Sequence, residues 1–248
     1  MGSISLITIC LNAEKTLRRA VASVLKQTRP PDEYLFVDGG STDGTLALLD
    51  DLRETLEASH IRVTILHQVH REGAAGIPEA WNQGIRAATG DVIAMLNSDD
   101  WYAPAALATV DRLFATKPSA CLVAVPVRFV QDDGMCVKVS CPKCSCLLPI
   151  LMPLPHPGLF VRKRVYEQIG NYDERYRISA DYDFVWRCHK AAMEIVYGEE
   201  PLVSMELGGL ANRNRCLARR ETRQIACRHG WDKVTPWLAW GLRSMLGR

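Results

Sequence analysis

Residues 3–44, SISLITICLNAEKTLRRAVASVLKQTRPPDEYLFVDGGSTDG, contain the pattern that decides the fold. The run ISLITICL at 4–11 is continuously apolar and rich in β-branched residues, which is typical of a strand covered on both faces in a parallel sheet. Apolar residues then recur at helical spacing over 17–25, and Pro30-Pro31 closes that helix. YLFVD at 34–38 is again an apolar run. The stretch therefore predicts a strand, a helix and a second strand.

The same alternation continues to about residue 100. A helix with leucines at helical spacing follows the second strand, RVTILHQ at 62–68 predicts a third strand, a helix is expected around 80–88, and a strand at 91–96. Strands that alternate with helices in this way form parallel sheets with right-handed crossovers, which bind ligands at the carboxyl ends of the strands. We therefore expect an α/β fold, with a mostly parallel, Rossmann-like sheet flanked by helices.

The rhythm of the sequence loosens after Pro104. A helix is expected to about Thr116, a strand over 121–129, and a short strand over 158–163 after a cysteine-rich connection. We predict that this second half shapes the pocket of a second substrate. The expected division is a first half at 1–102, a second half of the same domain at 103–210, and a basic, tryptophan-containing helical tail at 211–248.

Composition excludes several classes of protein. The chain of 248 residues is 48% apolar, which is enough for a continuous core and argues against disorder. Its 30 basic and 28 acidic residues are too evenly balanced for a nucleic-acid-binding protein. No apolar stretch approaches the roughly 20 residues that span a bilayer. The nine cysteines, an odd number spread over strands and helices, favour free thiols and a cytoplasmic location.

Polar residues follow the predicted strands at the point where each strand ends. Asn12 follows the first strand, Asp38 ends the second, and Asn97, Asp99 and Asp100 follow the fourth. Two adjacent carboxylates repel each other, and a hard divalent cation shared with substrate phosphates relieves that repulsion. The alternative for Asp100 is an N-cap of the next helix.

The loop GGSTDG after Asp38 has glycines that allow a sharp turn and a close approach of the backbone to a ligand. It lacks the spacing of a dinucleotide-binding or phosphate-binding loop. Asp38, as the last strand residue beside small neighbours, is placed to accept hydrogen bonds from a base or ribose, and a purely structural role is the alternative. A helix is also expected to begin near Asp181, where an acid gains from the helix dipole. Capping is the alternative for both Asp181 and Asp183.

Taken together, these elements resemble glycosyltransferase family 2, a large group with the GT-A fold. The resemblance runs from Ser3 to about Gly209, and its motifs occur in the expected order. They are TICLNAEKTLRRAVASVLKQT (8–28), EYLFVDGGSTDGT (33–45), EAWNQGIRAATGDVIAMLNSDDWY (79–102) and HPGLFVRKRVYEQIGNYDERYRISADYDFVWR (156–187).

The resemblance implies an inverting enzyme that uses a nucleotide-sugar donor and Mg²⁺ or Mn²⁺. Asp99 is assigned to ribose and metal, Asp100 to metal, and Asp181 to the general base that takes the proton of an acceptor hydroxyl. His156, on a proline-rich loop, is a candidate for binding acceptor or diphosphate, with a structural role as the alternative. The residues expected to bind the nucleotide-sugar are Ile9, Leu11, Asp38, Arg71 and Asp99.

Two positions depart from the family pattern. Gly39 stands where many relatives have a second acid that recognises uracil, so the expected preference for a UDP-sugar is not fixed by that position. Asn97 stands where the metal motif often has aspartate, and its carbonyl can still coordinate. The sequence Gln-x-x-Arg-Trp, which marks processive relatives, does not occur. Transfer of a single sugar is expected.

Two further segments leave alternatives open. The cysteines at 136, 141, 144 and 146 either bind zinc or are free thiols. The tail, with WDKVTPWLAWGLRSMLGR at 231–248, either rests on a membrane surface, which would suit a lipid-linked acceptor at the inner face of the membrane, or packs on the domain. A saccharide is the other acceptor class expected.

Two other functions compete with a glycosyltransferase. A nucleotidyltransferase is disfavoured because TICLNAEKTL at 8–17 lacks the glycine-rich loop with Arg and Lys that such enzymes place after the first strand. The remaining alternative is a non-catalytic sugar-nucleotide binder or scaffold of a glycan assembly complex. The joint presence of Asp99, Asp100 and Asp181 argues for catalysis.

Overall fold

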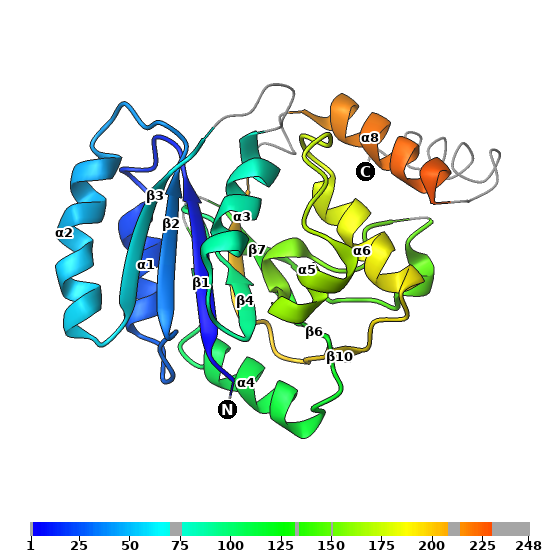
Figure 1. Ribbon diagram of the computed structural model, residues 1–248, viewed down its shortest axis with the longest axis horizontal. Helices are drawn as coiled ribbons and strands as arrows, with labels where there is room; N and C mark the ends of the chain where they lie inside the picture. Colours follow the sequence, from blue (N-terminus) through cyan, green and yellow to red (C-terminus); the bar gives the residue numbers. More distant parts are fainter. Residues whose placement is uncertain (1, 70–75, 132–133, 150, 208–213, 230–248) are drawn as a thin grey trace.

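The computed structural model describes residues 2–69, 76–131, 134–149, 151–207 and 214–229. At its centre is a mostly parallel sheet of seven strands flanked by helices, which confirms the predicted α/β class (Figure 1). All strand pairs in this sheet are parallel except those of β9. In spatial order the strands are β10 (Ile195–Tyr197), β6 (Leu122–Ala124), β9 (Leu159–Arg162), β4 (Val92–Met95), β1 (Ile4–Cys10), β2 (Glu33–Asp38) and β3 (Arg62–His67).

Helices cover both faces of this sheet, and each face has its own apolar cluster. One cluster holds α1, α2 and α4, and the other holds α3, α5 and α6. The bounds of the helices are α1 (Leu17–Leu25), α2 (Thr45–Ala58), α3 (Gly76–Ala87), α4 (Ala106–Thr116), α5 (Lys163–Ile169), α6 (Ala180–Lys190) and α8 (Arg215–Arg228), with two short 3₁₀ turns, η1 (Ser145–Leu147) and η2 (His156–Gly158).

Strand β1 is buried on both faces, as its continuous apolar run predicts. Leu6 is 0% exposed in one cluster and Ile7 is 1% exposed in the other, because successive side chains of a strand point to opposite faces. Helix α3 packs so closely on β1 that a Cβ at Gly84 would lie 2.6 Å from the Cγ2 of Ile7. Glycine at this position therefore sets the distance between the helix and the sheet.

The prediction of a single strand over 121–129 is wrong. The chain forms β6, leaves the large sheet at Val125 and Pro126, and then forms β7 in a second sheet. Proline has no N–H to donate to a strand ladder, which explains the break at this point. The second sheet contains, in spatial order, β5 (Trp101–Tyr102), β11 (Val203–Glu206), β7 (Val127–Val130) and β8 (Cys136–Ser140).

The described part of the tail is a helix that packs on the domain. Helix α8 contacts α6, and Ile225 is fully buried in the same apolar cluster as α6 (Figure 1). Residues 231–248, for which membrane contact or packing on the domain was predicted, lie outside the described residues, so both alternatives stay predictions. Within the described ranges, no helix combines the length and the apolar character needed to span a bilayer.

Candidate active site

The predicted polar residues gather at one edge of the large sheet. Strand β1 pairs in parallel with β2 on one side and with β4 on the other. The strand order of the sheet therefore reverses between β1 and β4. A crevice outside the carboxyl ends of the strands is expected at such a switch point. Asp38 and Asp99 therefore lie on the same edge, on either side of the end of β1.

The end of β1 presents an apolar side chain to this edge. Leu11 is 63% exposed, whereas Ile9 is half-buried against the sheet. Asn12 follows with a φ of 52°, a left-handed conformation that asparagine tolerates better than most residues. Its side-chain oxygen accepts the N–H of Thr42 at 2.8 Å, and its own N–H donates to the Ser41 hydroxyl at 2.9 Å. The loops after β1 and β2 are thus tied together.

Asp38 organises the loop that follows β2. The residue is 1% exposed, and one carboxylate oxygen accepts the N–H groups of Gly40 at 2.9 Å and Ser41 at 3.0 Å. The other oxygen accepts the Ser41 hydroxyl at 2.5 Å. These hydrogen bonds give Asp38 a part in holding the loop, while its predicted contact with a base or ribose stays a prediction.

Asp99 and Asp100 follow β4 and have different surroundings. Asp99 is half-buried, whereas Asp100 is 1% exposed. Burial, and then the Asp99 charge, hold the pKa of Asp100 well above its usual range. Its oxygens accept the amide N–H of Asn97 at 3.0 Å and the backbone N–H of Glu206 at 3.3 Å. Burial and the nearby Glu206 also raise the pKa of Asp99.

Two residues of this site were not anticipated from the sequence. Arg19, on α1, forms an ion pair with Glu206, at the end of β11, and donates to the carbonyl oxygen of Asp99 at 2.9 Å. The Arg19 guanidinium also lies 4.1 Å from the centre of the Trp101 ring. Arg19 and Glu206 lie far from Asp99 in the sequence, so local spacing carries no signal for them. They bring a cation and a third carboxylate to the end of β4.

Asp181 lies in the first turn of α6 and is half-buried. One of its oxygens accepts the N–H of Tyr182 at 2.8 Å. The helix dipole was expected to favour the ionised form, but burial outweighs it and raises the pKa of Asp181 to about 6. A carboxylate with this pKa is largely ionised at neutral pH and is a stronger base than an ordinary aspartate.

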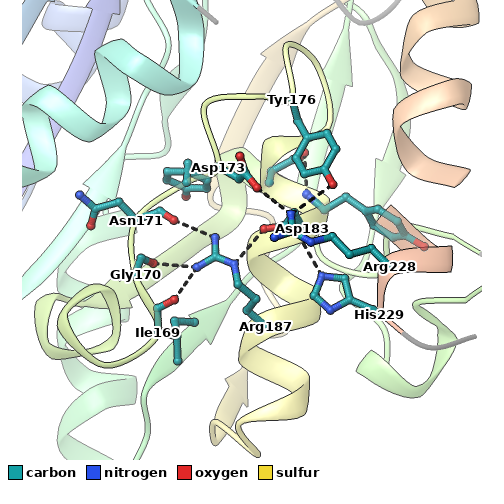
Figure 2. A network of polar contacts seen from close by, with 12 residues as sticks. Ile169, Gly170, Asn171, Asp173, Tyr176, Asp183, Arg187, Arg228 and His229 are labelled. Atoms are coloured by element: carbon teal, nitrogen blue, oxygen red, sulfur yellow. Dashed lines mark hydrogen bonds and ion pairs between the residues drawn. The ribbon is translucent and has the colours of Figure 1, made fainter. Parts of the chain in front are cut away.

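Asp183 is held in an ion-pair network, shown in Figure 2. It is 2% exposed, and its oxygens contact Arg187 Nε at 2.8 Å and His229 Nε2 at 3.0 Å. Burial alone would raise the pKa of Asp183, but hydrogen bonds from His229 and Arg187 outweigh burial and lower it. Arg187 also donates to three backbone carbonyls before α6, those of Ile169 at the end of α5 and of Gly170 and Asn171 in the following loop. Asp183 therefore joins α6 to α8 and to this loop.

His156 lies in an aromatic cluster with Trp81 and Tyr172. Its ring stacks on Trp81 of α3, with centroids 4.3 Å apart, and its Nε2 is 3.3 Å from the Tyr172 hydroxyl. Burial lowers the pKa of His156 to about 4, so the imidazole is neutral near pH 7. A neutral ring supplies stacking and a hydrogen bond but no positive charge to a diphosphate.

Tyr172 connects this aromatic cluster to Asp181. Its hydroxyl reaches the sulfur of Met95, the last residue of β4, at 3.9 Å. Burial, above all, raises the pKa of Tyr172, and the Asp181 charge adds to that shift. Tyr172 therefore contacts the end of β4, the strand that Asp99 and Asp100 follow, and responds to the charge of Asp181 at the start of α6.

Residues 5–180 match the sequence profile of Glycosyl transferase family 2. The chain belongs to this family. The chain is also 30% identical over 214 residues to the "PGL/p-HBAD biosynthesis glycosyltransferase" of Mycobacterium tuberculosis, an alignment that covers 84% of this chain and 78% of that relative. The family assignment and the order of motifs that predicted it are thus confirmed.

Solved structures of other glycosyltransferases share the fold. Residues 1–349 of TarS from S. aureus, in complex with UDP, superpose with a TM-score of 0.69 at 16% identity, covering 96% of this chain and 69% of that one. The mannosyltransferase PcManGT from Pyrobaculum calidifontis, in complex with GDP-Man and Mn²⁺, gives 0.68 at 16% identity, covering 100% and 76%. The present chain spans 41% of a longer TarS chain. The glycosyltransferase thus has the GT-A fold.

The donor atoms at the end of β4 fit a divalent cation. Two adjacent carboxylates and the Asn97 amide are hard oxygen ligands, and burial, followed by the Asp99 charge, raises the pKa of Asp100. Within the described residues, no three His, Cys, Asp or Glu side chains gather as metal ligands would. Mg²⁺ and Mn²⁺ suit such a site, because one or two carboxylates hold Mg²⁺ together with substrate phosphates and water.

Other predicted residues of the glycosyltransferase lie elsewhere or outside the described ranges. Arg71 falls in 70–75, which the structure does not describe. Cys136, Cys141, Cys144 and Cys146 are exposed, and none of them forms a disulfide within the described part of the chain. Zinc binding and free thiols both stay open for this segment.

Proposed function

We propose that this family 2 glycosyltransferase moves one sugar from a nucleotide-sugar donor to a hydroxyl acceptor with inversion at the anomeric carbon. The observation that carries the proposal is the pair of neighbouring acids on α6. Asp183 is fixed in ion pairs, whereas Asp181 is half-buried, has a pKa of about 6, and carries a charge that acts on Tyr172, whose hydroxyl contacts Met95 at the end of β4. Asp181 is therefore the acid suited to accept a proton.

In the proposed reaction Asp181 takes the proton of the acceptor hydroxyl as its oxygen attacks the anomeric carbon. The new carbon–oxygen bond forms while the bond from that carbon to the donor phosphate breaks, and the nucleoside diphosphate leaves with the electron pair. Asp99 and Asp100, with Asn97, would hold Mg²⁺ or Mn²⁺. When bound, this cation would offset the negative charge that grows on the leaving diphosphate.

The two halves of the domain divide the substrates in this proposal. Residues 1–102 hold the donor, with the end of β1 and the loop after Asp38 nearest the nucleotide. The groups of the chain that would contact the nucleotide there are the exposed Leu11 side chain, through apolar contact, and the backbone of the loop between β2 and α2. Residues 103–210, with His156 and Asp181, hold the acceptor. The aromatic ring of Trp81, stacked on His156, lies at the boundary between the two.

A UDP-sugar is our first choice of donor and a GDP-sugar the second. Solved relatives of this fold hold UDP, UDP-GlcNAc or GDP-Man. The residue at position 39 is glycine, and a Cβ there would lie 3.2 Å from Gln68 Oε1. Gln68 therefore occupies the space beside Gly39 and offers a carbonyl oxygen to a base.

For the acceptor we propose a saccharide or a lipid-linked molecule, handled at the inner face of the cytoplasmic membrane. The name of the mycobacterial relative, with its role in PGL/p-HBAD biosynthesis, supports a glycan or glycolipid product. A cavity of about 410 Å³ adjoins the loop before α6 and is a candidate for part of the acceptor site. Its lining residues are Arg175, Tyr176, Leu217, Arg220, Glu221, Gln224 and Arg228.

The test is donor hydrolysis by the full chain with a panel of UDP-, GDP- and TDP-sugars and Mn²⁺. We expect slow release of one nucleoside diphosphate above background, abolished by chelator and by Asp181→Asn. The competing function is a non-catalytic sugar-nucleotide binder, which would bind a donor with Mn²⁺ and release no product from it. Nucleotide binding without turnover toward any donor and acceptor would therefore favour that alternative.

A further inference from the structure

The backbone that leads into α6 is held by one buried side chain from α8. Glu221 is 5% exposed, although a carboxylate is costly to bury unless it is well hydrogen-bonded. Its oxygens accept three consecutive backbone N–H groups, each at 2.8 Å. The donors are Arg177, to Oε1, and Ile178 and Ser179, both to Oε2. A residue more than 40 positions away thus fixes the last three residues before the helix.

The cap of α6 uses α8 as well. Ser179 is the N-cap residue of α6, yet its side chain makes no capping hydrogen bond to that helix. Its hydroxyl instead contacts the Ala218 carbonyl at 3.3 Å and the Thr222 hydroxyl at 3.4 Å. The first N–H groups of a helix region need partners from outside the helix. The backbone N–H and the hydroxyl of Ser179 are therefore both bonded to residues of α8.

Asp181 comes two residues after Ser179, and its oxygen accepts the backbone N–H of Tyr182. The direction of this carboxylate is therefore set by the backbone at the start of α6. We propose that Glu221 is a positioning residue for Asp181, fixing the start of α6 so that the carboxylate points at the acceptor hydroxyl. This role rests on the proposed function of Asp181 as general base.

The charge of Glu221 gives this role a separate readout. Burial chiefly raises the pKa of Asp181, and the nearby Glu221 charge raises it further. The charge of Asp181 also acts on Tyr172, whose hydroxyl contacts the Tyr166 hydroxyl of α5 and the His156 ring of η2. These neighbours are uncharged near pH 7, because burial raises the pKa of both tyrosines and lowers that of His156. Glu221 is therefore the charged neighbour whose removal should move the titration of Asp181.

The experiment compares Glu221→Gln, Glu221→Ala and Asp183→Asn with the wild-type chain. Glutamine keeps one acceptor oxygen but turns an NH₂ group toward a backbone donor and removes the charge. We expect kcat to fall about tenfold for Glu221→Gln and about a hundredfold for Glu221→Ala, since a displacement of about 1 Å in a reacting group has effects of this size. The KM for the donor should stay within about twofold of wild type, because the donor lies at the strand ends.

Two measurements separate positioning from general support of the fold. The acid limb of the kcat profile should move to lower pH in Glu221→Gln, and hydrogen exchange at the amides of residues 177–179 should accelerate. Asp183→Asn is the matched control, because it weakens another buried α6 to α8 contact and leaves the Glu221 bonds in place. Its acid limb should stay at the wild-type pH even if its stability falls.

The outcomes distinguish this proposal from the proposed function. If Asp181→Asn is inactive while Glu221→Gln keeps wild-type kcat and acid limb, the positioning role is wrong and the base assignment stands. A rise in the KM for the acceptor at unchanged kcat would also overturn it, since Glu221, which lines the cavity proposed for the acceptor, would then act by contacting substrate and not by positioning Asp181. If Asp181→Asn retains full turnover, both proposals fall. Should Glu221→Ala not fold, Glu221→Gln and its amide exchange decide.

Discussion

The ion pairs of Asp183 predict a large loss of stability when that residue is replaced. Asp183 is 2% exposed, and the side chains of its partners Arg187 and His229 are 22% and 9% exposed. Removing one partner of a buried ion pair costs about 3–5 kcal/mol. Arg187 keeps three carbonyl acceptors, at 2.7–2.8 Å, which offset part of that cost. For Asp183→Ala we therefore expect a loss of about 2–4 kcal/mol in the free energy of unfolding.

Urea unfolding followed by circular dichroism measures this loss as a lower midpoint at unchanged slope. The pKa of Asp183 is lowered in the folded state, so its contribution is present above the unfolded pKa of about 3.9 and is lost as pH falls through the lower folded value. The difference between variant and wild type should therefore be full at pH 7 and shrink in acid. In a double-mutant cycle, Asp183→Ala and His229→Ala should be coupled.

Asp50→Ala is the control for Asp183→Ala. Asp50 lies on α2, pairs with Arg53 at 3.6 Å, and has a side chain that is 74% exposed. Exposed pairs contribute about 0–1 kcal/mol, so this variant should be close to wild type. Equal, small effects of the two substitutions would refute the conclusion that α8 is docked on α6 through Asp183.

Three other predictions follow from the site and the tail. Asp100→Asn should remove Mn²⁺-dependent nucleotide binding, seen by calorimetry, and lower turnover at least about a hundredfold while the fold is kept; full activity in excess chelator would contradict it. Because the base must be deprotonated, kcat should rise with pH through about 6 and level off above it; a kcat that is flat from pH 5 to 8 would contradict this titration of the base. The same raised pKa means that the stability contributed by protonated Asp181 is lost as pH rises from about 4 through about 6. Removal of residues 231–248 should release the protein from anionic vesicles in a sedimentation assay, and unchanged vesicle binding would favour a tail that packs on the domain.

The first half of the fold was predictable because its signals are local. The apolar runs of β1, β2 and β4 announce buried strands, and acids that directly follow such strands must lie at the sheet edge. The second half was harder, since its strands β5, β10 and β11 have only two to four residues and show no period. Pro126 was the one local signal that could have divided the strand expected over 121–129.

The partners of the acids were not predictable, because they come from distant segments. Arg19 and Glu206 are 187 residues apart and meet beside Asp99. Glu221 meets residues 177–179 across more than 40 residues. A helix dipole argument placed Asp181 correctly but gave the wrong direction for its pKa, since burial depends on how α6, α8 and the aromatic cluster pack. Position along the chain thus located the acids, while packing determined their chemistry.

The most direct test of the proposed mechanism is to measure, for Asp181→Asn, both the turnover and the affinity for the donor nucleotide and to compare each with wild type. Asparagine keeps the shape of the side chain and its capping oxygen but removes basicity. We predict that nucleotide affinity with Mn²⁺, measured by calorimetry, stays within about twofold of wild type while kcat falls by roughly two to four orders of magnitude. Near wild-type turnover in Asp181→Asn, or a larger fall in Asp183→Asn at an equal folded fraction, would contradict the assignment of Asp181 as the general base.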